Sequence, residues 1–170
     1  HGANVSLQLF GTLRGWSTAP GAETNPGPTI TVDQGDHITL DLTSEDGFDH
    51  TFWIDYDGDG RVDSGEPLSA LFSTSTTFVF DANVAGTFTY YCSIHCGTPC
   101  NPTSSLMRGT WVTRGLTVAI ATPTAATSWT GGVAHDIVFN LGGTDPPSSL
   151  TVWVNFTRNG GTVTGTIAGP

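Results

Sequence analysis

The sequence of 170 residues predicts an all-β protein, either a β-sandwich or a β-barrel. Short runs in which apolar and polar residues alternate are the pattern of half-buried strands. The runs contain Val5, Leu7 and Leu9; Ile30 and Val32; Ile38, Leu40 and Leu42; Phe52 and Ile54; Phe78 and Phe80; and Phe88, Tyr90 and Cys92. Turns rich in proline and glycine separate them, and no segment longer than about ten residues keeps a helical period.

After Gly115 the turns between the alternating runs become rich in Thr, Gly and Pro. We therefore expect two domains, residues 1–115 and 116–170. Alternating runs continue in the second domain. They contain Val118 and Ile120; Ile137, Phe139 and Leu141; and Leu150, Val152, Val154 and Phe156. The stretch from Trp129 to Asn155 resembles the front half of Ig-like repeats of secreted microbial surface proteins. Because an Ig-like sandwich needs about 100 residues, we expect a partial Ig-like β-module, completed by further chain or by strands from elsewhere.

The composition is strongly acidic: fifteen Asp and Glu residues oppose five Lys and Arg residues, and the net charge is -10. This balance argues against binding to nucleic acid or to anionic lipid and favours cationic partners, including metal ions. No apolar run approaches the roughly 18 residues that span a bilayer, so we expect no membrane span. Because the sequence starts at His1 without an initiator Met, we expect a secreted protein from which a signal peptide has been removed.

Three cysteines lie close together at positions 92, 96 and 100, and one thiol stays unpaired if the other two form a disulfide. Cys92 ends an alternating run, so its side chain is expected to point into the rim of the sandwich. Thiolate and imidazole ligands select copper, and two His, one Cys and a weak axial Met form the blue-copper arrangement. Cys92, His95 and Met107 supply three of these ligands from one loop.

The fourth copper ligand has to come from a distant strand, and His50 opens the alternating run that continues to Ile54. These residues resemble the cupredoxin family in order, spacing and type. The matching stretches are Asn25-Pro26-Gly27-Pro28-Thr29-Ile30-Thr31-Val32, Gly35-Asp36, His50-Thr51-Phe52, Tyr90-Tyr91-Cys92-Ser93-Ile94-His95 and Met107-Arg108-Gly109-Thr110. The resemblance covers about residues 25–115 and implies a Greek-key sandwich with one type 1 copper that transfers single electrons.

The resemblance also implies that His95 is the more exposed ligand and the point at which electrons enter and leave. The chain departs from the family at one point. Members of the family place the Met a few residues after the second His, whereas residues 96–106 intervene here before Met107. A disulfide between Cys96 and Cys100 would pin this intervening loop.

Other metal sites stay open at this stage. Cys92 and Cys96 match the Cys-x-x-x-Cys of a dinuclear copper site of the cytochrome oxidase subunit II kind, but that site wants a His at position 100. Cys and His together also bind zinc. An N-terminal His1 is similar to the copper brace of monooxygenases that act on polysaccharides, with His37 or His135 as the second His.

The twelve residues from Asp55 to Glu66 match an EF-hand calcium loop at every liganding position. The predicted ligands are Asp55, Asp57, Asp59, Arg61 through its backbone carbonyl, Asp63 and Glu66. Gly60 permits the sharp turn in such a loop. The flanking helices are missing because the preceding residues form a predicted strand. We expect a structural calcium ion, and the alternative is an acidic turn without metal.

The sequence predicts no catalytic residues, since nucleophile elbows, metalloprotease patterns and further His-x-His pairs are absent from it. We expect an electron carrier whose partner is another redox protein, rather than an enzyme. The alternative is a structural subunit of an extracellular filament or surface layer, completed by strand exchange between neighbouring subunits. An electron carrier should be monomeric in solution, whereas a filament subunit should polymerise.

Overall fold

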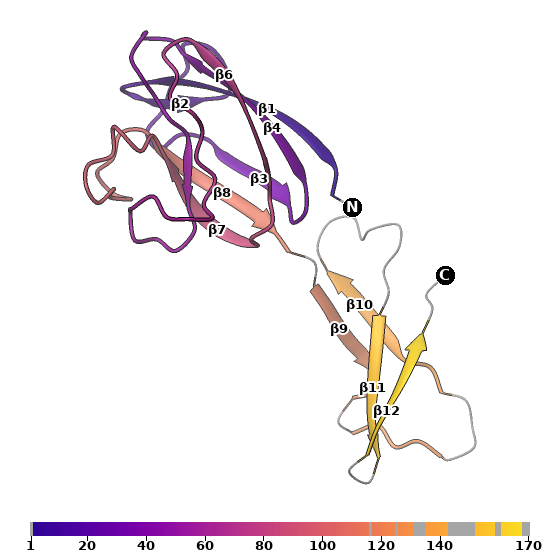
Figure 1. Cartoon of the computed structure of the whole chain (residues 1–170). Coiled ribbons are helices and arrows are strands. Elements are labelled where there is room, and N and C mark those ends of the chain that lie inside the picture. Colours follow the sequence, from indigo (N-terminus) through magenta and orange to yellow (C-terminus); the bar gives the residue numbers. More distant parts are fainter. Residues whose placement is uncertain are drawn as a thin grey trace. The chain divides into compact units, whose positions relative to one another are not determined.

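The computed structural model describes residues 2–115, 117–124, 126–130, 135–142, 152–158 and 161–167. The chain divides into two compact units, one formed by Gly2–Gly115 and the other by the residues from Leu116 onward (Figure 1). Each unit consists of strands and their connections. Among the described segments, none is a helix with the length and hydropathy needed to span a bilayer.

The first unit is a sandwich of two four-stranded sheets, which confirms the predicted all-β class. One sheet has the strand order β2-β1-β4-β6 and the other has the order β3-β8-β7-β5. The strands are β1 (Asn4–Thr12), β2 (Gly15–Ser17), β3 (Thr29–Asp33), β4 (His37–Ser44), β5 (Trp53–Asp55), β6 (Ser75–Asp81), β7 (Gly86–Tyr91) and β8 (Arg108–Arg114). Between β2 and β7 each successive strand joins the opposite sheet, so the connections cross the ends of the sandwich.

The register of the strands puts the alternating apolar residues into one core. β1 pairs with β4 in parallel, with Leu7 opposite Leu40, and β3 pairs with β8 in parallel. The remaining pairs within the two sheets are antiparallel. Since side chains alternate between the faces of a strand, this register buries Leu9, Leu40 and Leu42 completely.

Aromatic side chains fill the core between the two sheets. Phe52 lies at the centre, with ring centroids 5.2 Å from Tyr90 and 6.1 Å from both Trp16 and Trp111. All four side chains are fully buried. Rings of this size are rigid and contribute large apolar areas, so the end of the sandwich next to them forms a fixed frame for the loops above it.

The second unit contains two pairs of antiparallel strands. They are β9 (Thr117–Thr122) with β10 (Val138–Gly142), and β11 (Val152–Arg158) with β12 (Gly161–Ile167). Two of the predicted alternating apolar residues, Val118 and Ile120, are exposed on β9. The predicted strand residue Leu150 lies outside the described residues. The interpretation of this unit as a partial Ig-like module stays a prediction.

Candidate metal centre

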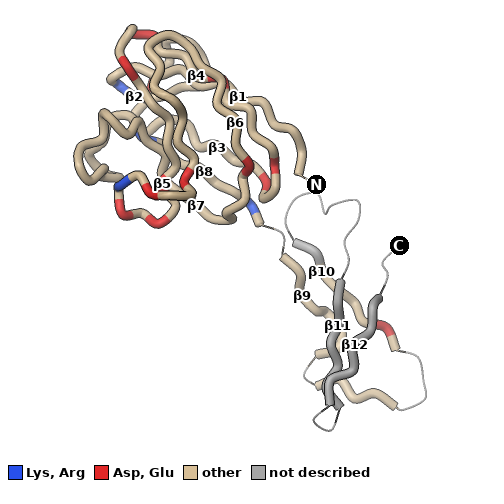
Figure 2. The backbone as a smooth tube through the Cα atoms, in the orientation of Figure 1, with Lys and Arg blue, Asp and Glu red and all other residues tan. Residues whose placement is uncertain are grey.

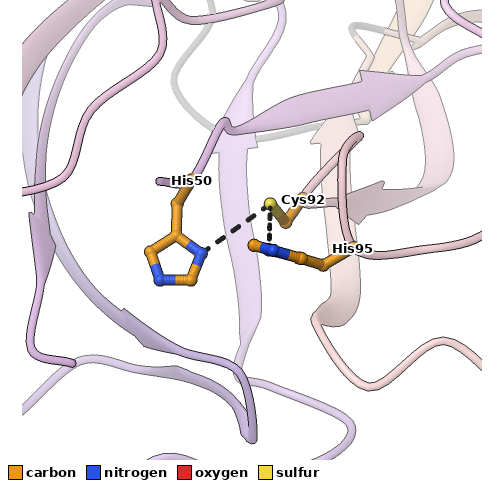
Figure 3. A group of neighbouring side chains, drawn as sticks. All are labelled: His50, Cys92 and His95. Carbon is orange, nitrogen blue, oxygen red and sulfur yellow. Dashed lines mark hydrogen bonds between the residues drawn. The ribbon is translucent and has the colours of Figure 1, made fainter. Parts of the chain in front are cut away.

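Three of the four predicted copper ligands lie together at one end of the first unit. One ligand atom from each of His50, Cys92 and His95 lies within 4.8 Å of the others. The Cys92 Sγ atom is 3.9 Å from Nδ1 of His50 and 3.3 Å from Nδ1 of His95 (Figure 3). His50 and Cys92 are fully buried, and His95 is partly exposed. Both imidazoles therefore direct the same ring nitrogen toward one thiol.

His50 occupies its place through backbone contacts just before β5. The sequence places it at the opening of a strand, whereas β5 begins only at Trp53. His50 instead forms an isolated bridge with Phe72, in which each backbone N–H donates to the other residue's carbonyl, at 2.8 and 2.9 Å. These two hydrogen bonds fix the backbone of His50 relative to that of Phe72. His50 Nε2 lies 2.9 Å from Oδ1 of Asp46.

Cys92 and His95 belong to the turn that follows β7. The His95 N–H donates to the Cys92 carbonyl at 3.1 Å, which closes the turn. The Thr51 N–H points at Cys92 Sγ, 3.4 Å away, and the Ser93 N–H donates to Oγ1 of Thr51 at 2.9 Å. Thr51 thus joins the His50 segment to the Cys92 turn. The thiol accepts a backbone N–H here, which stabilises the negative charge of a thiolate.

Met107, the predicted fourth ligand, lies directly before β8 and is fully buried. Its carbonyl accepts the Cys92 N–H at 3.0 Å, so the two residues are backbone neighbours despite the loop between them. Both side chains belong to the main hydrophobic core, together with Trp16. The role of the Met107 sulfur as axial ligand stays a prediction.

The loop between His95 and Met107 is held by side chains of its own. Cys96 and Cys100 form a disulfide with a Cα–Cα distance of 4.7 Å, and both are buried in a small cluster with Trp53 and Tyr91. The Ser105 hydroxyl donates to the Cys96 carbonyl at 2.8 Å. The free thiol left by this pairing is Cys92. A dinuclear copper site does not fit, because Cys96 has no thiolate to offer.

The protonation of the three clustered side chains is shifted by their environment. Burial favours a higher pKa for the Cys92 thiol, but the contact with His50 and hydrogen bonds from backbone N–H groups outweigh it and lower the pKa. Burial lowers the pKa of His50, yet its contacts with Cys92 and Asp46 raise the pKa overall. Burial and then the charge of His50 lower the pKa of His95. The lowered thiol pKa favours the thiolate, which is the metal-binding form.

The donor set fits a type 1 copper ion. Two imidazole nitrogens and one thiolate converge in a buried space, and this soft trigonal set suits copper in electron-transfer sites. The alternative copper brace of His1 with His37 or His135 stays a prediction from the sequence. His37 Nδ1 is 2.7 Å from Oδ1 of Asp81, and His135 belongs to the second unit. His1 lies outside the described residues.

The acidic loop, residues 55–66, follows β5 and carries a concentration of Asp and Glu (Figure 2). Carboxylate oxygens of Asp55, Asp57 and Asp59 lie within 4.8 Å of one another. The backbone N–H groups of Gly58 and Gly60 donate to the two oxygens of Asp55, at 2.7 and 3.0 Å. Burial raises the pKa of Asp55 although these N–H groups oppose the shift.

The other predicted calcium ligands lie outside this group of three carboxylates. The Glu66 carboxylate accepts hydrogen bonds from Nε1 of Trp53 at 2.7 Å and from the N–H groups of Tyr56 and Asp63 at 2.6 and 3.0 Å. The Arg61 N–H donates to Asp59 at 2.8 Å. Glu66 thereby closes the loop against β5.

The acidic loop also contacts the loop that follows His95. The Cys100 N–H donates to the Gly60 carbonyl at 2.7 Å, and a Cβ atom on Gly60 would lie 2.3 Å from the Cys100 carbonyl oxygen. Gly60 also has a positive φ of 76°, which favours glycine. Glycine at this position therefore serves both the turn of the acidic loop and its contact with the disulfide.

Sequence reasoning missed the residues that hold the ligands in place. Asp46, Thr51 and Ser93 each hydrogen bond to a predicted ligand or to the segment that carries one. Asp46 stands four residues before His50, and a carboxylate close to a predicted ligand His is a signal for such a contact. Thr51 and Ser93 give no comparable signal, because their contact joins segments about forty residues apart.

No family model matches the chain, and no curated protein matches it either. Several solved structures are similar to it. Auracyanin A, a blue copper protein from Chloroflexus aurantiacus, is 17% identical with a TM-score of 0.48, over 65% of this chain and 99% of its own. Auracyanin from Roseiflexus castenholzii is 17% identical with a TM-score of 0.45, over 66% of this chain and 98% of its own.

A copper nitrite reductase from Nitrosomonas europaea is 18% identical with a TM-score of 0.46, over 66% of this chain and 42% of its own.

The fold and the ligand cluster of the first unit can be compared directly with the resemblance that the sequence predicts. Two facing sheets frame a cluster of His50, Cys92 and His95, which brings the sequence-predicted ligands together. The first unit of this chain resembles the cupredoxin family in its fold and in this cluster.

Proposed function

We propose that this protein is a secreted electron carrier that holds one type 1 copper ion through His50, Cys92, His95 and Met107. The observation that carries the proposal is the convergence of two imidazole Nδ1 atoms on one buried thiol. When bound, copper would supply a one-electron couple between Cu(II) and Cu(I). The chain's own residues would supply a thiolate, two oriented imidazoles and exclusion of water from the buried side of the site.

The partial exposure of His95 supports a route for electrons to a partner. His50 and Cys92 are enclosed by the sandwich, whereas His95 lies at its end. Electron transfer between proteins requires close approach of the two centres, and the exposed ligand is the shortest way in. We propose another redox protein as the partner. The disulfide between Cys96 and Cys100 fits an oxidising compartment outside the cytosol.

We propose in addition that the acidic loop binds a structural calcium ion through Asp55, Asp57, Asp59, the carbonyl of Arg61, Asp63 and Glu66. The support is the group of three carboxylates and the sequence match over twelve residues. Without a cation these like charges repel one another. Calcium prefers six to eight oxygen ligands, so binding would draw the Glu66 carboxylate toward the Asp group.

The test of the copper proposal is the visible absorption spectrum after addition of one equivalent of Cu(II). We expect an intense thiolate-to-copper charge-transfer band in the orange-red region, giving a blue or green protein. The Cys92→Ser variant should lose this band entirely. His37→Ala, which removes an exposed histidine outside the cluster, is the matched control and should keep it. A colourless wild-type protein would overturn the proposal.

The structural-subunit alternative is motivated by the second unit. Val118 and Ile120 expose apolar side chains on β9, which is the condition under which a neighbouring subunit gains by covering a strand. Sedimentation of the copper-loaded protein separates the two functions. A monomer over a wide concentration range favours the electron carrier, and growing oligomers favour the filament or surface layer.

A further inference from the structure

Both nitrogens of the His50 ring have a defined neighbour, although the ring is fully buried. Nδ1 faces the Cys92 thiol at 3.9 Å, and Nε2 lies 2.9 Å from Oδ1 of Asp46. In Figure 3 the second nitrogen of the ring points away from the thiol. The Asp46 side chain is 20% exposed, so this contact is largely shielded from solvent.

The remaining contacts of Asp46 decide which of the two groups donates the hydrogen bond. Its Oδ2 accepts the Leu13 N–H at 2.7 Å, and its Oδ1 accepts the Phe48 N–H at 3.1 Å. Both oxygens are thus occupied as acceptors, which is the role of an ionised carboxylate. The His50 Nε2 therefore donates to Asp46.

This assignment fixes the tautomer of His50. A neutral imidazole carries its proton on one nitrogen and a lone pair on the other. With the proton on Nε2, the lone pair is on Nδ1 and points at the space between Cys92 and His95. A metal-binding imidazole needs this arrangement, and a carboxylate on the far nitrogen both orients the ring and increases its basicity.

Asp46 itself is held by two separate parts of the chain. Leu13 lies in the turn between β1 and β2, whereas Phe48 belongs to the segment between β4 and β5. The carboxylate therefore keeps its position relative to the sheet that carries β1 and β4, independently of the Cys92 turn. His95 differs, because it is partly exposed and its Nε2 has no hydrogen-bond partner among the described residues.

We infer that Asp46 is a positioning residue of the copper site, which fixes His50 as the Nε2–H tautomer and shifts the copper couple toward Cu(II). The inference rests on the proposed copper function. A carboxylate behind one ligand adds negative charge near the metal, and this charge stabilises Cu(II) more than Cu(I) because Cu(II) carries the higher charge. The partly exposed His95 lacks such support, so the two imidazoles have different roles.

The experiment compares the Asp46→Asn and Asp49→Asn variants of the full chain, each loaded with copper. Both remove one negative charge near the cluster, but Asp49 is exposed and acts on His95 through its charge alone, without a hydrogen bond to either imidazole. Loss of such an outer carboxylate typically costs 10- to 100-fold in metal affinity. For Asp46→Asn we expect the preference for Cu(II) over Cu(I) to fall at least tenfold, which raises the reduction potential by about 59 mV for one electron. Asp49→Asn should shift it much less.

A second measurement does not depend on how well a variant folds. In the diamagnetic Cu(I) wild-type protein, long-range proton–nitrogen NMR spectra report the tautomer of each histidine. We expect a His50 proton on Nε2 that exchanges slowly with water and a faster exchange at His95. A His50 proton on Nδ1, or one that exchanges as fast as that of His95, would overturn the inference.

The outcomes keep the inference apart from the proposed function. If the wild-type protein shows no thiolate charge-transfer band with Cu(II), the copper function fails and the inference fails with it. If the band is present but Asp46→Asn and Asp49→Asn shift the potential equally, the function stands and the positioning role of Asp46 is wrong. A selective shift in Asp46→Asn, together with the slow Nε2 proton, supports the inference.

Discussion

The cluster of His50, Cys92 and His95 and the acidic loop gather potential metal ligands in opposite ways. The cluster lies at the end of the core, with two of its three side chains fully buried. The acidic loop presents Asp57 and Asp59 to solvent. The cluster contains one thiol and two imidazoles, groups whose ionised forms carry charges of opposite sign. The loop brings several carboxylates of like charge together.

The cluster and the acidic loop also differ in the contacts that hold their side chains in place. In the cluster, Thr51 and Asp46 hold the ligands through hydrogen bonds to other parts of the sandwich. In the acidic loop, backbone N–H groups of the loop itself satisfy Asp55. Repulsion among the loop carboxylates opposes folding unless a cation compensates it. The comparison teaches that other parts of the sandwich hold the cluster, whereas the loop's own backbone holds its Asp55 carboxylate. We expect the proposed calcium ion to add to the order of the loop carboxylates.

Removal of calcium should therefore have the largest effect on stability. A ligand at a hundred times its dissociation constant stabilises the folded protein by about 2.7 kcal/mol. We expect the free energy of unfolding to drop by about that amount when a chelator is added to the calcium-loaded protein. Thermal unfolding followed by circular dichroism, with and without chelator, measures this difference.

The matched variants for this measurement are Asp57→Asn and Asp49→Asn, which each remove one exposed charge. Asp57→Asn should abolish most of the response to calcium, and Asp49→Asn should keep it. An equal response in both variants would contradict binding in the acidic loop. If the chelator leaves the stability of the wild-type protein unchanged, the loop is an acidic turn without metal.

In the metal-free protein, acid should change the stability contributions of Asp46 and Asp55 in opposite directions. Burial opposes the shift at Asp46, but hydrogen bonds from His50 and from backbone N–H groups lower its pKa to about 2. A lowered pKa in the folded state stabilises the protein above the unfolded pKa of about 4. We expect up to about 2 kcal/mol of this stability to be lost as the pH falls from 4 to 2.

Asp55 should respond in the opposite direction. Its pKa is raised, first by burial and despite the N–H groups of Gly58 and Gly60, so its ionised form costs stability above that pKa. Falling pH relieves this cost. Relative to wild type, Asp46→Asn should flatten the acid loss and Asp55→Asn should steepen it. Denaturant unfolding between pH 2 and 6 checks both slopes, and slopes of the same sign would contradict the comparison.

The sequence predicts most of the first unit because its signals are local. Alternation locates strands such as β4 and β6, and the sandwich follows from their apolar faces. The exact start of β5 is not local. The sequence places His50 in the strand, but pairing with Phe72, twenty-two residues later, takes the backbone of His50 out of β5 and into a separate bridge. Partners of this kind are decided by tertiary structure.

The site is predictable in its ligands but not in its supports. His50, Cys92 and His95 are recognisable because metal chemistry restricts the residue types. Thr51 and Ser93 are ordinary polar residues in the sequence, and their role appears only when the loops meet. Asp46 has a local signal, because it stands four residues before His50. The contact of Gly60 with Cys100 is also invisible, since both residues already have local explanations in the acidic loop and the disulfide.

Two glycine substitutions should have the smallest effects on stability. Each should affect only one of the two regions, the cluster or the acidic loop. A Cβ atom at Gly11 would lie 2.7 Å from the Trp16 ring and 3.2 Å from the Met107 methyl group. Overpacking of this kind costs roughly 1–3 kcal/mol, and the loss of unfolded-state entropy returns about 0.4–1 kcal/mol. We expect Gly11→Ala to destabilise the protein by about 1 kcal/mol and to alter the copper spectrum.

Gly58→Ala is the counterpart in the acidic loop. Gly58 has a positive φ of 77° and open space around it, so an alanine there meets backbone strain and no neighbouring atom. Strain in this region costs about 1–2 kcal/mol, and the substitution should weaken calcium binding while the copper spectrum stays unchanged. Because the two sites share no contact through these residues, the double variant should show additive losses of stability. A copper spectrum that stays unchanged in Gly11→Ala would argue against Met107 as a ligand, since the added methyl also lies closer to the Met107 methyl group than an ordinary contact allows.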